Sequence, residues 1–301
     1  KVEIGNYIAE PSSIFMGRGK HPFRGKWKAG PTESDIILNL SPDAPCPPGN
    51  WNAIVWEPDY MWVARWKDKL TGKIKYVWLS DAFIGKQKRE IEKFDWANEL
   101  GKSINKLRKH ILTNLTAQDM TRRKLATVSF LIDRLKLRVG DEKDKDEADT
   151  IGATTLRPEH IHIVSDESAV FDFLGKDSVR WCKEVKLHPK VIENLKEFGV
   201  NAKSPIFEGI RSENIKLFLG EAVPKLTAKV FRTYHASNVV RDALKKSKIS
   251  KDNPPFVKKH VAVMANLQAA IECNHKRKLP KKWQESLGKK KGRLKKLRQK
   301  K

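Results

Sequence analysis

The sequence predicts an α+β protein in which a small β-rich, tryptophan-rich lobe precedes a mainly α-helical lobe. Six of the nine tryptophans lie between Trp27 and Trp78, among frequent Gly and Pro residues. From Ile91 onward the apolar residues recur every three or four positions, which is typical of helices. Alternation returns over residues 170–185 and predicts a β-hairpin inserted in the helical lobe. We therefore expect lobes at residues 1–88 and 89–275 and the start of a basic linker at 276–301.

The first lobe is expected to contain an aromatic hairpin. Aromatic residues alternate over 60–66 and again over 74–78, and Leu70-Thr71-Gly72-Lys73 between them has the composition of a turn. One face of this hairpin would therefore be aromatic. Exposed tryptophans can stack on nucleic-acid bases, but burial in the core is their more common role, and we expect that role here.

The second lobe is expected to open with two helices. Apolar residues recur at helical spacing from Trp96 to Leu115 and again from Leu125 to Leu135. The second helix should end near Gly140, because glycine is common just beyond the last turn of a helix. That end puts Arg138 in the last turn, where a cation complements the negative end of the helix. Another helix is expected over 257–274, with alanines for close packing and His275 directly after it.

The charge of the chain predicts a polyanionic partner. Its 61 Lys and Arg outnumber 36 Asp and Glu, which gives a net charge of +25 over 301 residues. Residues 276–301 hold fourteen Lys and Arg against one acid, Glu285, so this tail carries +13 and the rest of the chain +12. A basic tail alone would suit a localisation signal or a nonspecific nucleic-acid arm. The surplus in the body indicates a binding surface on the fold as well.

Cysteine spacing and hydropathy indicate an intracellular protein. Cys46, Cys182 and Cys273 have no paired spacing, as a reducing compartment allows. No apolar run has the length of a membrane span or the form of a signal peptide, so we expect no membrane partner. The chain begins at Lys1 rather than Met, and we interpret it as processed or as a piece of a longer protein.

Two histidines are the strongest candidates for metal ligands, and they are weak ones. His160 and His162 share an expected strand face. Zinc sites combine histidine with Cys, further His or an acid at characteristic spacing, and no such Cys or acid accompanies this pair. We therefore expect no metal site.

One segment places a cation where an apolar face is expected. At helical period, Leu226–Ser237 puts Arg232 beside Phe231 on the inward side. A buried guanidinium needs a carboxylate, carbonyl oxygens or a bound anion to replace its water, and the local sequence offers no acid before Asp242. A bound phosphate would satisfy it. The alternative is an arginine that snorkels to solvent from an ordinary amphipathic helix.

Five segments resemble motifs of the eukaryote-type type IB DNA topoisomerases. In chain order they are EPSSIFMGRGKHP (10–22), LIDRLKLRVGDEK (131–143), FDFLGKDSVRW (171–181), LTAKVFRTYHAS (226–237) and IECNHKR (271–277). ADTIGATTLRPEHI (148–161) resembles a structural signature of the same family. Met16 stands where the family has an arginine. The resemblance runs to about residue 280 and implies a helical lobe like that of the tyrosine recombinases and type IB topoisomerases.

The resemblance implies roles for particular residues. Arg138, Arg232 and His275 would bind the scissile DNA phosphate, and Lys176 would protonate the leaving oxygen. Contacts to DNA would come from Arg18, Lys20, His21, Asp177 and Lys229.

The implied activity is that of a DNA topoisomerase, an isomerase that serves replication and transcription. A tyrosine attacks a phosphodiester of double-stranded DNA and forms a 3'-phosphotyrosine, and religation follows once supercoils have relaxed. The covalent bond conserves the energy of the broken one, so ATP is unnecessary. Guanidinium groups and an imidazole neutralise the charge that develops on the phosphate, so no metal or other cofactor is expected. The implied location is intracellular and DNA-associated, in a nucleus or nucleoid.

No tyrosine of this chain fits the nucleophile of the family. Tyr7, Tyr60 and Tyr76 lie in the aromatic lobe, and Tyr234 falls where the family has a non-nucleophilic tyrosine. We expect the nucleophile in a separate C-terminal domain or small subunit, so that this chain binds DNA without relaxing it. The alternatives are a tyrosine recombinase or integrase catalytic domain, which shares the Arg, Lys, Arg and His chemistry, and a noncatalytic basic DNA-binding protein.

Overall fold

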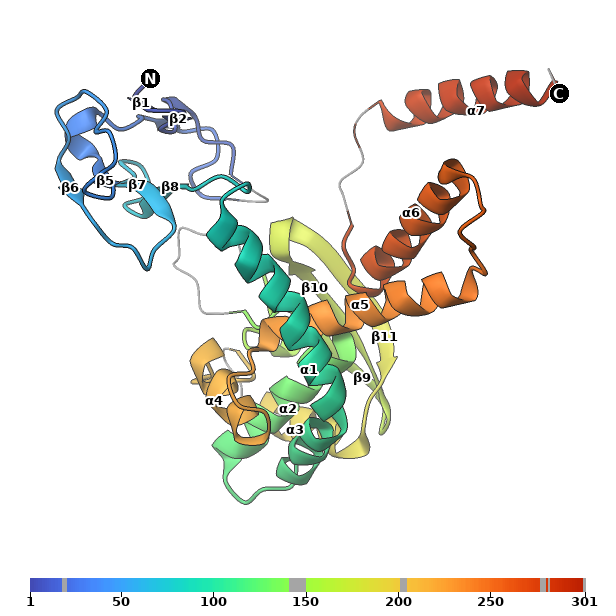
Figure 1. Cartoon of the computed structure of the whole chain (residues 1–301). Coiled ribbons are helices and arrows are strands. Elements are labelled where there is room, and N and C mark those ends of the chain that lie inside the picture. Colours follow the sequence, from blue (N-terminus) through green and yellow to red (C-terminus); the bar gives the residue numbers. More distant parts are fainter. Residues whose placement is uncertain (18–20, 141–149, 201–204, 277–279, 281, 300–301) are drawn as a thin grey trace. The chain divides into compact units, whose positions relative to one another are not determined.

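The computed structural model describes residues 1–17, 21–140, 150–200, 205–276, 280 and 282–299, without the side chains of residues 177 and 200 (Figure 1). The described chain combines helices with several small sheets, in agreement with the predicted mixture of α and β structure. It divides into two compact units, Lys1–Asn238 and Val239–Lys301. The predicted loop at 141–149 lies outside the described residues.

The N-terminal β lobe contains three small sheets. The strands are β1 (Glu3–Ile4), β2 (Tyr7–Ile8), β3 (Ser13–Ile14), β4 (Trp27–Lys28), β5 (Ile37–Asn39), β6 (Ala53–Val55), β7 (Trp62–Lys67) and β8 (Ile74–Trp78). β1 pairs with β2 and β3 with β4, while the largest sheet has the order β6-β5-β7-β8. β5 and β6 are parallel, and β7 and β8 pair antiparallel around the Leu70–Lys73 turn. A separate apolar cluster built on Ile36, Leu38 and Ala64 forms the core of this lobe.

Asp68 organises the turn between β7 and β8. Its Oδ1 accepts hydrogen bonds from the backbone N–H groups of Leu70 at 3.1 Å and Thr71 at 2.8 Å. Its Oδ2 lies 2.7 Å from Nζ of Lys28, which is 2% exposed and also reaches Glu10 at 2.6 Å. Burial alone would raise the pKa of the Asp68 carboxyl, but the hydrogen bonds from Lys28 and Thr71 outweigh it and lower that pKa. The buried lysine thus joins β4 to the hairpin.

The tryptophans of this lobe divide between core and surface, which corrects the expectation that they are mostly core. Trp62 and Trp66 are buried, but Trp27, Trp56 and Trp78 are each more than half exposed. The reason is the position of the strands. β7 has a partner strand on each side, whereas β8 is an edge strand in which every second residue, at Ile74, Tyr76 and Trp78, is exposed. On that face the ring of Trp78 stacks on Tyr76 at 4.9 Å between centroids.

Asp35 gives the β lobe a defined acid sensitivity. Its carboxylate accepts from Lys69 Nζ at 2.7 Å and from both the N–H and the hydroxyl of Thr32 at 2.7 Å. These hydrogen bonds lower the pKa of Asp35 to about 2, and the one from Lys69 makes the largest contribution. A depressed folded-state pKa contributes stability above the ordinary value of about 4, and this contribution is lost as the pH falls from about 4 to about 2.

We therefore predict that Asp35→Asn flattens the acid side of the stability profile. Between about pH 4 and pH 2 the unfolding midpoint of the wild-type chain should fall more steeply than that of the variant, because only the wild type must protonate Asp35. Tryptophan fluorescence during urea unfolding measures this, since six of the nine tryptophans are in the lobe. Parallel profiles for the two proteins would contradict the prediction.

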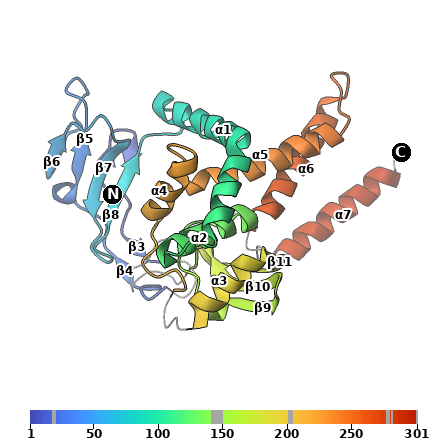
Figure 2. The same ribbon diagram turned by 90° about the horizontal axis from the view of Figure 1, so that it is seen from below.

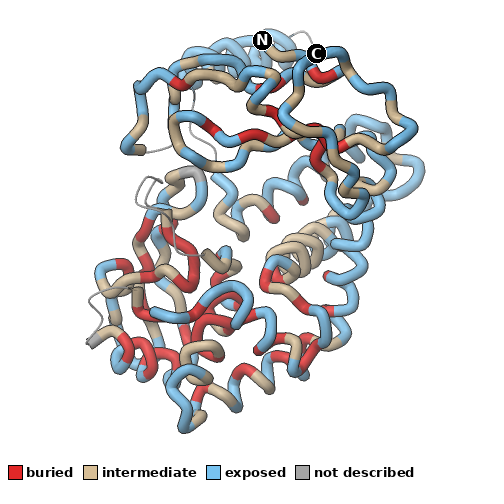
Figure 3. The backbone as a smooth tube through the Cα atoms, turned by 90° about the vertical axis from the view of Figure 1, so that its left-hand side faces the viewer, coloured by how far each residue is buried: buried red, intermediate tan, exposed pale blue. Residues whose placement is uncertain are grey.

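The helical lobe packs around one apolar core (Figure 3). Its elements are α1 (Ile84–Asn114), α2 (Met120–Leu135), β9 (Ile161–Ser165), β10 (Ser168–Gly175), β11 (Val179–Lys186), α3 (Pro189–Val200), α4 (Ser212–Ala222) and the first turns of α5 (Ala228–Lys246). The second half of α1 is buried at Leu100, Ile104, Leu107 and Ile111, the spacing that the sequence shows, while Ile84 and Ile91 in its first half are exposed.

α2 ends five residues before the predicted end at Gly140. Asp119 caps its start, because the carboxylate accepts from the N–H groups of Thr121 at 3.0 Å and Arg122 at 3.2 Å. At the other end Lys136 adopts a left-handed conformation, with φ 55° and ψ 34°, and stops the helix after Leu135. The prediction that Arg138 lies in the last turn of this helix is therefore wrong. Arg138 lies in the loop that follows α2.

A three-stranded sheet in the order β11-β10-β9 packs in the same core as α2 and α3 (Figure 2). β10 and β11 pair antiparallel from Ser168↔Lys186 to Gly175↔Val179, and a single 3₁₀ turn, Lys176–Ser178, joins them. Phe171, Phe173 and Trp181 point into the core, where Phe173 and Trp181 stack at 5.5 Å. The prediction that His160 and His162 share a strand face is wrong. His160 belongs to the 3₁₀ turn Pro158–His160, which precedes β9.

The second unit consists of the rest of α5, α6 (Pro255–Glu272) and α7 (Trp283–Gln299). α7 carries the basic tail and has no buried residue among those described. Ala265 and Ala269 are the buried residues of α6, which matches the prediction that its alanines allow close packing. No helix of the described chain is both long enough and apolar enough to cross a membrane.

Candidate active site

Arg138 is held by a loop with little freedom. Leu137 beside it is buried at 4% exposure and anchors the segment in the core, while the Arg138 side chain is exposed. The carbonyl oxygen of Arg138 accepts from the N–H of Ala153 at 2.8 Å, and that of Val139 accepts from Thr154 at 2.8 Å. The backbone of Arg138 is therefore fixed from two sides, although its side chain reaches into solvent.

The same stretch also ties Arg138 to the hairpin that carries Lys176. The N–H of Ile151 donates to the carbonyl of Leu174 at 2.7 Å, two residues before Lys176. Residues 151–154 thus bond to the Arg138 loop through Ala153 and Thr154 and to the end of β10 through Ile151. This arrangement gives a physical role to residues 151–154, which the sequence marks only as part of a structural signature.

The junction depends on two glycines in close contact. A Cβ on Gly152 would lie 2.4 Å from Cα of Gly140 and 2.7 Å from the carbonyl oxygen of Val139. Gly140 has φ +80°, in the left-handed region that favours glycine. Only glycine at both positions lets the two backbones approach this closely.

Gly152→Ala is predicted to destabilise the chain by about 1–3 kcal/mol, because an added methyl group would force the two backbone segments apart. Urea unfolding followed by circular dichroism measures the change in free energy. The matched control is Gly220→Ala in α4, where an added Cβ meets no atom within 4 Å. That variant should gain about 0.5–1 kcal/mol, because alanine favours a helix more than glycine does. Equal stabilities of the two variants would contradict the prediction.

Arg232 lies on the first turns of α5, next to the buried Phe231. It is half-buried, and Nη1 donates a hydrogen bond of 2.5 Å to the carbonyl oxygen of Lys136. A half-buried guanidinium needs hydrogen-bond acceptors, and the carbonyl oxygen of Lys136 supplies one of them for Arg232. Lys136 ends α2 and lies two positions before Arg138. No signal within the local sequence of α5 identifies this partner.

The two arginines line a common pocket of about 790 Å³. Its walls come from the first half of α1, the loop after α2 and the start of α5. Five lining cations, Arg89, Lys93, Arg138, Lys229 and Arg232, accompany one acid, Glu92. The starts of α4 and α5 also line it, at Ser212 and at Ala228. Helix N-termini carry partial positive charge, so the pocket suits an anion such as a phosphate diester.

Unpaired charge in this pocket strengthens that assignment. Among the described residues neither Arg138 nor Lys229 forms an ion pair with a carboxylate, and both side chains are exposed. Arg89, Lys93 and Trp96 were not predicted as site residues. The run of four cations at 86, 88, 89 and 93 was the available signal, but such a run on an exposed helix is more often simply solvated.

Lys176 lies at the tip of the β10–β11 turn and is exposed. It is not among the residues that line the pocket. Ser178 closes the turn with φ 57°, a left-handed conformation in a non-glycine residue. Backbone bonds of Ile151, Ala153 and Thr154 connect the end of β10, two residues before Lys176, to the Arg138 loop.

His275 is fixed at the end of α6 by its backbone. Its N–H donates to the carbonyl of Ala270 at 2.7 Å, and the N–H of Asn274 donates to that of Ile271 at 3.0 Å. With Asn274 at φ 49°, these two bonds form a complete Schellman motif. The His275 side chain is exposed. His275 belongs to the second unit, so its approach to the two arginines stays a prediction.

The predicted DNA contacts are only partly described. Arg18 and Lys20 lie outside the described residues, as does the side chain of Asp177. The His21 ring packs beside Phe15, with 4.7 Å between centroids, and its Nδ1 accepts from the N–H of Phe23 at 3.1 Å. These contacts give His21 a structural role in the turn. Lys229 is the predicted contact that the structure brings to the pocket.

The described part of the chain contains no group of three or more His, Cys, Asp or Glu side chains that could hold a metal ion. His160 is buried, and its Nδ1 accepts from the N–H of Arg157 at 3.1 Å. The ring therefore stabilises the turn before β9.

Comparison with known proteins identifies the family. A family model described as "Eukaryotic DNA topoisomerase I, catalytic core" matches residues 84–301, and one described as "Eukaryotic DNA topoisomerase I, DNA binding fragment" matches residues 1–79. The chain belongs to the eukaryotic DNA topoisomerase I family. The division between the two topoisomerase models falls just before α1, which begins at Ile84.

Individual topoisomerases show the same similarity. The chain is 37% identical to DNA topoisomerase 1 of Candidozyma auris over 285 residues, which cover 92% of the chain and 38% of that protein. It is 37% identical to DNA topoisomerase 1 alpha of Arabidopsis thaliana over 289 residues, or 93% of the chain and 31% of that protein. It is 36% identical to DNA topoisomerase 1 of Homo sapiens over 300 residues, or 95% of the chain and 39% of that protein. The chain thus spans between 31% and 39% of the length of these relatives.

Proposed function

We propose that this chain is the DNA-binding and phosphate-activating core of a type IB DNA topoisomerase. The observation that carries the proposal is the pocket in which Arg138 and Arg232 meet beside Lys229 and the start of α5. The substrate is double-stranded DNA, and the protein works in association with DNA in a nucleus or nucleoid. We also propose that the helical lobe resembles the catalytic domain of tyrosine recombinases, which use the same four residue types.

The chemistry is displacement at phosphorus. The tyrosine hydroxyl loses its proton to water as its oxygen attacks the phosphorus of a DNA diester, the bond from phosphorus to the 5' oxygen breaks, and the 3' end stays attached to the tyrosine. Negative charge accumulates on the nonbridging oxygens as this occurs. Arg138 and Arg232 offer charged N–H donors to those oxygens, and His275 donates to the second of them. Lys176 gives its proton to the departing 5' oxygen, which then leaves as a hydroxyl.

The attacking tyrosine comes from a separate segment. Tyr234 is two residues beyond Arg232 on α5, and its ring packs against Gly101 of α1. Positions two apart on a helix point to different sides, so Tyr234 does not share the direction of Arg232. We propose that a C-terminal domain or a small subunit supplies the nucleophile and that this chain alone binds DNA without relaxing supercoils. Relaxation of a supercoiled plasmid by this polypeptide alone would contradict this part of the proposal.

Affinity for DNA is expected to come mostly from phosphate contacts and to depend steeply on salt. Each phosphate that a protein neutralises adds about −0.9 to the slope of log affinity against log salt. A variant that ends at residue 281 lacks α7 with its seven Lys and Arg, and should show a shallower slope. Fluorescence anisotropy with a labelled duplex at a series of salt concentrations measures the slopes. An unchanged slope would mean that α7 does not lie on DNA.

The direct test of the proposed function uses the tyrosine-complete protein, in which this chain is joined to or mixed with the segment that supplies the nucleophile. We expect a covalent complex with the 3' end of a nicked strand, in the presence of a metal chelator and without ATP. A complex with the 5' end, or strand exchange between two specific sites in place of relaxation, would contradict the proposal.

A further inference from the structure

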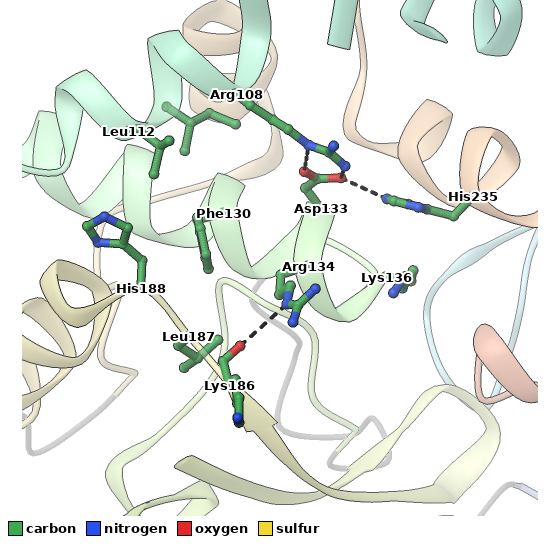
Figure 4. Close-up of a pocket in the computed structure, with 11 residues that line it drawn as sticks. Arg108, Leu112, Phe130, Asp133, Arg134, Lys136, Lys186, Leu187, His188 and His235 are labelled. Carbon is green, nitrogen blue, oxygen red and sulfur yellow. Dashed lines mark hydrogen bonds and ion pairs between the residues drawn. The ribbon is translucent and has the colours of Figure 1, made fainter. Parts of the chain in front are cut away.

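Three helices of the lobe meet at one buried carboxylate. Asp133 of α2 is 7% exposed. Its carboxylate accepts two hydrogen bonds from Arg108 of α1, from Nε at 2.7 Å and from Nη2 at 3.2 Å. Nε2 of His235 on α5 lies 2.7 Å from Oδ1 of the same carboxylate (Figure 4). Because that imidazole nitrogen faces a carboxylate oxygen, it carries the proton and donates the bond.

The buried carboxylate is held in its charged form. Burial alone would raise the pKa of Asp133, but the hydrogen bonds from His235 and Arg108 outweigh it and lower that pKa. An ionised Asp133 is the stronger acceptor for both partners. The contact to α5 is therefore a charge-assisted hydrogen bond in a low-dielectric setting.

This contact is adjacent to the bond that orients Arg232. His235 follows Arg232 by three residues on α5, so both lie on one face of that helix. Asp133 precedes Lys136 by three residues, and the carbonyl of Lys136 accepts from Arg232. Residues 232–235 of α5 and residues 133–136 at the end of α2 are therefore joined by two hydrogen bonds. Two attachments fix the rotation of α5 about its own axis, whereas one attachment leaves that rotation soft.

We propose that Asp133 and His235 are a positioning pair, which fixes α5 so that the Arg232 guanidinium stays directed into the phosphate pocket. The inference rests on the proposed function of that pocket. Neither residue touches the reacting atoms. Both act through Arg232, and Arg108 acts by holding the Asp133 carboxylate in place.

The test is a double-mutant comparison in the tyrosine-complete protein, measured as the single-turnover rate of DNA cleavage at saturating protein. His235→Leu removes the donor and should slow cleavage about tenfold, within the range of coupling energies found inside one hydrogen-bonded network. In an Arg232→Ala background the same substitution should have almost no further effect, because the group that it positions is absent. DNA affinity, measured by anisotropy, should be unchanged by His235→Leu.

Conservative and matched variants separate positioning from general destabilisation. His235→Gln keeps an amide donor at the reach of the imidazole Nε2 and should restore most of the rate. His235→Asn is too short to reach Asp133, so it should behave as His235→Leu does and replaces it if that variant does not fold. His260→Leu makes the same chemical change at an exposed residue of α6 that has no bond to Asp133 or Arg108 in the described structure, and it should leave the rate unchanged. Thermal unfolding of each variant fixes a temperature at which all of them are folded.

Each outcome is decisive. Equal losses from His235→Leu with and without Arg232 would overturn the positioning role, as would a failure of glutamine to restore more activity than asparagine. If Arg232→Ala itself left cleavage unchanged, the proposed function of the pocket would fail instead, which distinguishes the two conclusions.

Discussion

Replacing Arg232 by alanine is expected to slow DNA cleavage about 10²- to 10³-fold, the range observed when one preorganised donor to a transition-state oxyanion is removed. The guanidinium lines the pocket and is oriented by its bond to the Lys136 carbonyl. Charge on the phosphate oxygens grows as the tyrosine attacks, so most of the contact energy is realised in the transition state. DNA affinity should therefore fall much less than the cleavage rate, because the ground-state complex loses only one phosphate contact.

The matched control is Arg241→Ala on the same helix. Position 241 lies nine residues after 232, and with 3.6 residues per turn the two side chains point to opposite sides of α5. Cleavage by Arg241→Ala should be close to that of the wild type, measured as the single-turnover rate in the tyrosine-complete protein. A similar loss in both variants, or a loss of DNA affinity that accounts for the whole effect of Arg232→Ala, would count against the pocket as the catalytic site.

Lys176→Ala is expected to slow cleavage about 10²- to 10⁴-fold, which is the usual contribution of a general acid. An alkoxide is a poor leaving group, and an exposed ammonium at the tip of a short turn can approach the 5' oxygen as the bond breaks. Single-turnover cleavage by the tyrosine-complete protein measures the loss. Lys183→Ala on β11, where the ammonium lies over the Trp181 ring, is the control and should keep a near-normal rate.

The role of Lys176 as an acid, rather than as a binding cation, is tested by changing the leaving group. A substrate with sulfur in place of the bridging 5' oxygen leaves as a thiolate, whose conjugate acid has a pKa of about 8.5, so it needs no proton at neutral pH. Lys176→Ala should cleave this substrate at nearly the wild-type rate. An equally large defect with oxygen and sulfur would show that the lysine contributes binding or structure instead.

The sequence predicted the elements that depend on local pattern. Apolar spacing placed α1 and α2, alternation placed strands at 60–66 and 74–78, and the surplus of basic residues indicated a polyanionic partner. Resemblance to known motifs indicated Arg138 and Arg232, which the structure brings to one pocket. These features are visible in short windows, because each depends on neighbours within about one or two turns of chain.

The features that the sequence missed depend on distant residues. The end of α2 is set by the left-handed Lys136, a conformation that lysine seldom adopts and that no local residue type indicates. The partner of His235 is 102 positions away in the chain, and the approach of Gly140 to Gly152 appears only once both backbones are placed. The exposed Trp27 and Trp78 follow from edge positions that composition does not show. Local pattern therefore identified candidate residues, and long-range packing determines how they are held.

Side chains far apart in the sequence are proposed to converge on a single phosphorus. The most direct test is the structure of this chain bound to duplex DNA, determined by crystallography or electron microscopy. We predict that the nonbridging oxygens of one phosphate lie within about 2.7–3.2 Å of N–H donors from Arg138, Arg232 and His275. A complex in which the two arginines contact different phosphates, or in which His275 contacts none, would contradict the account.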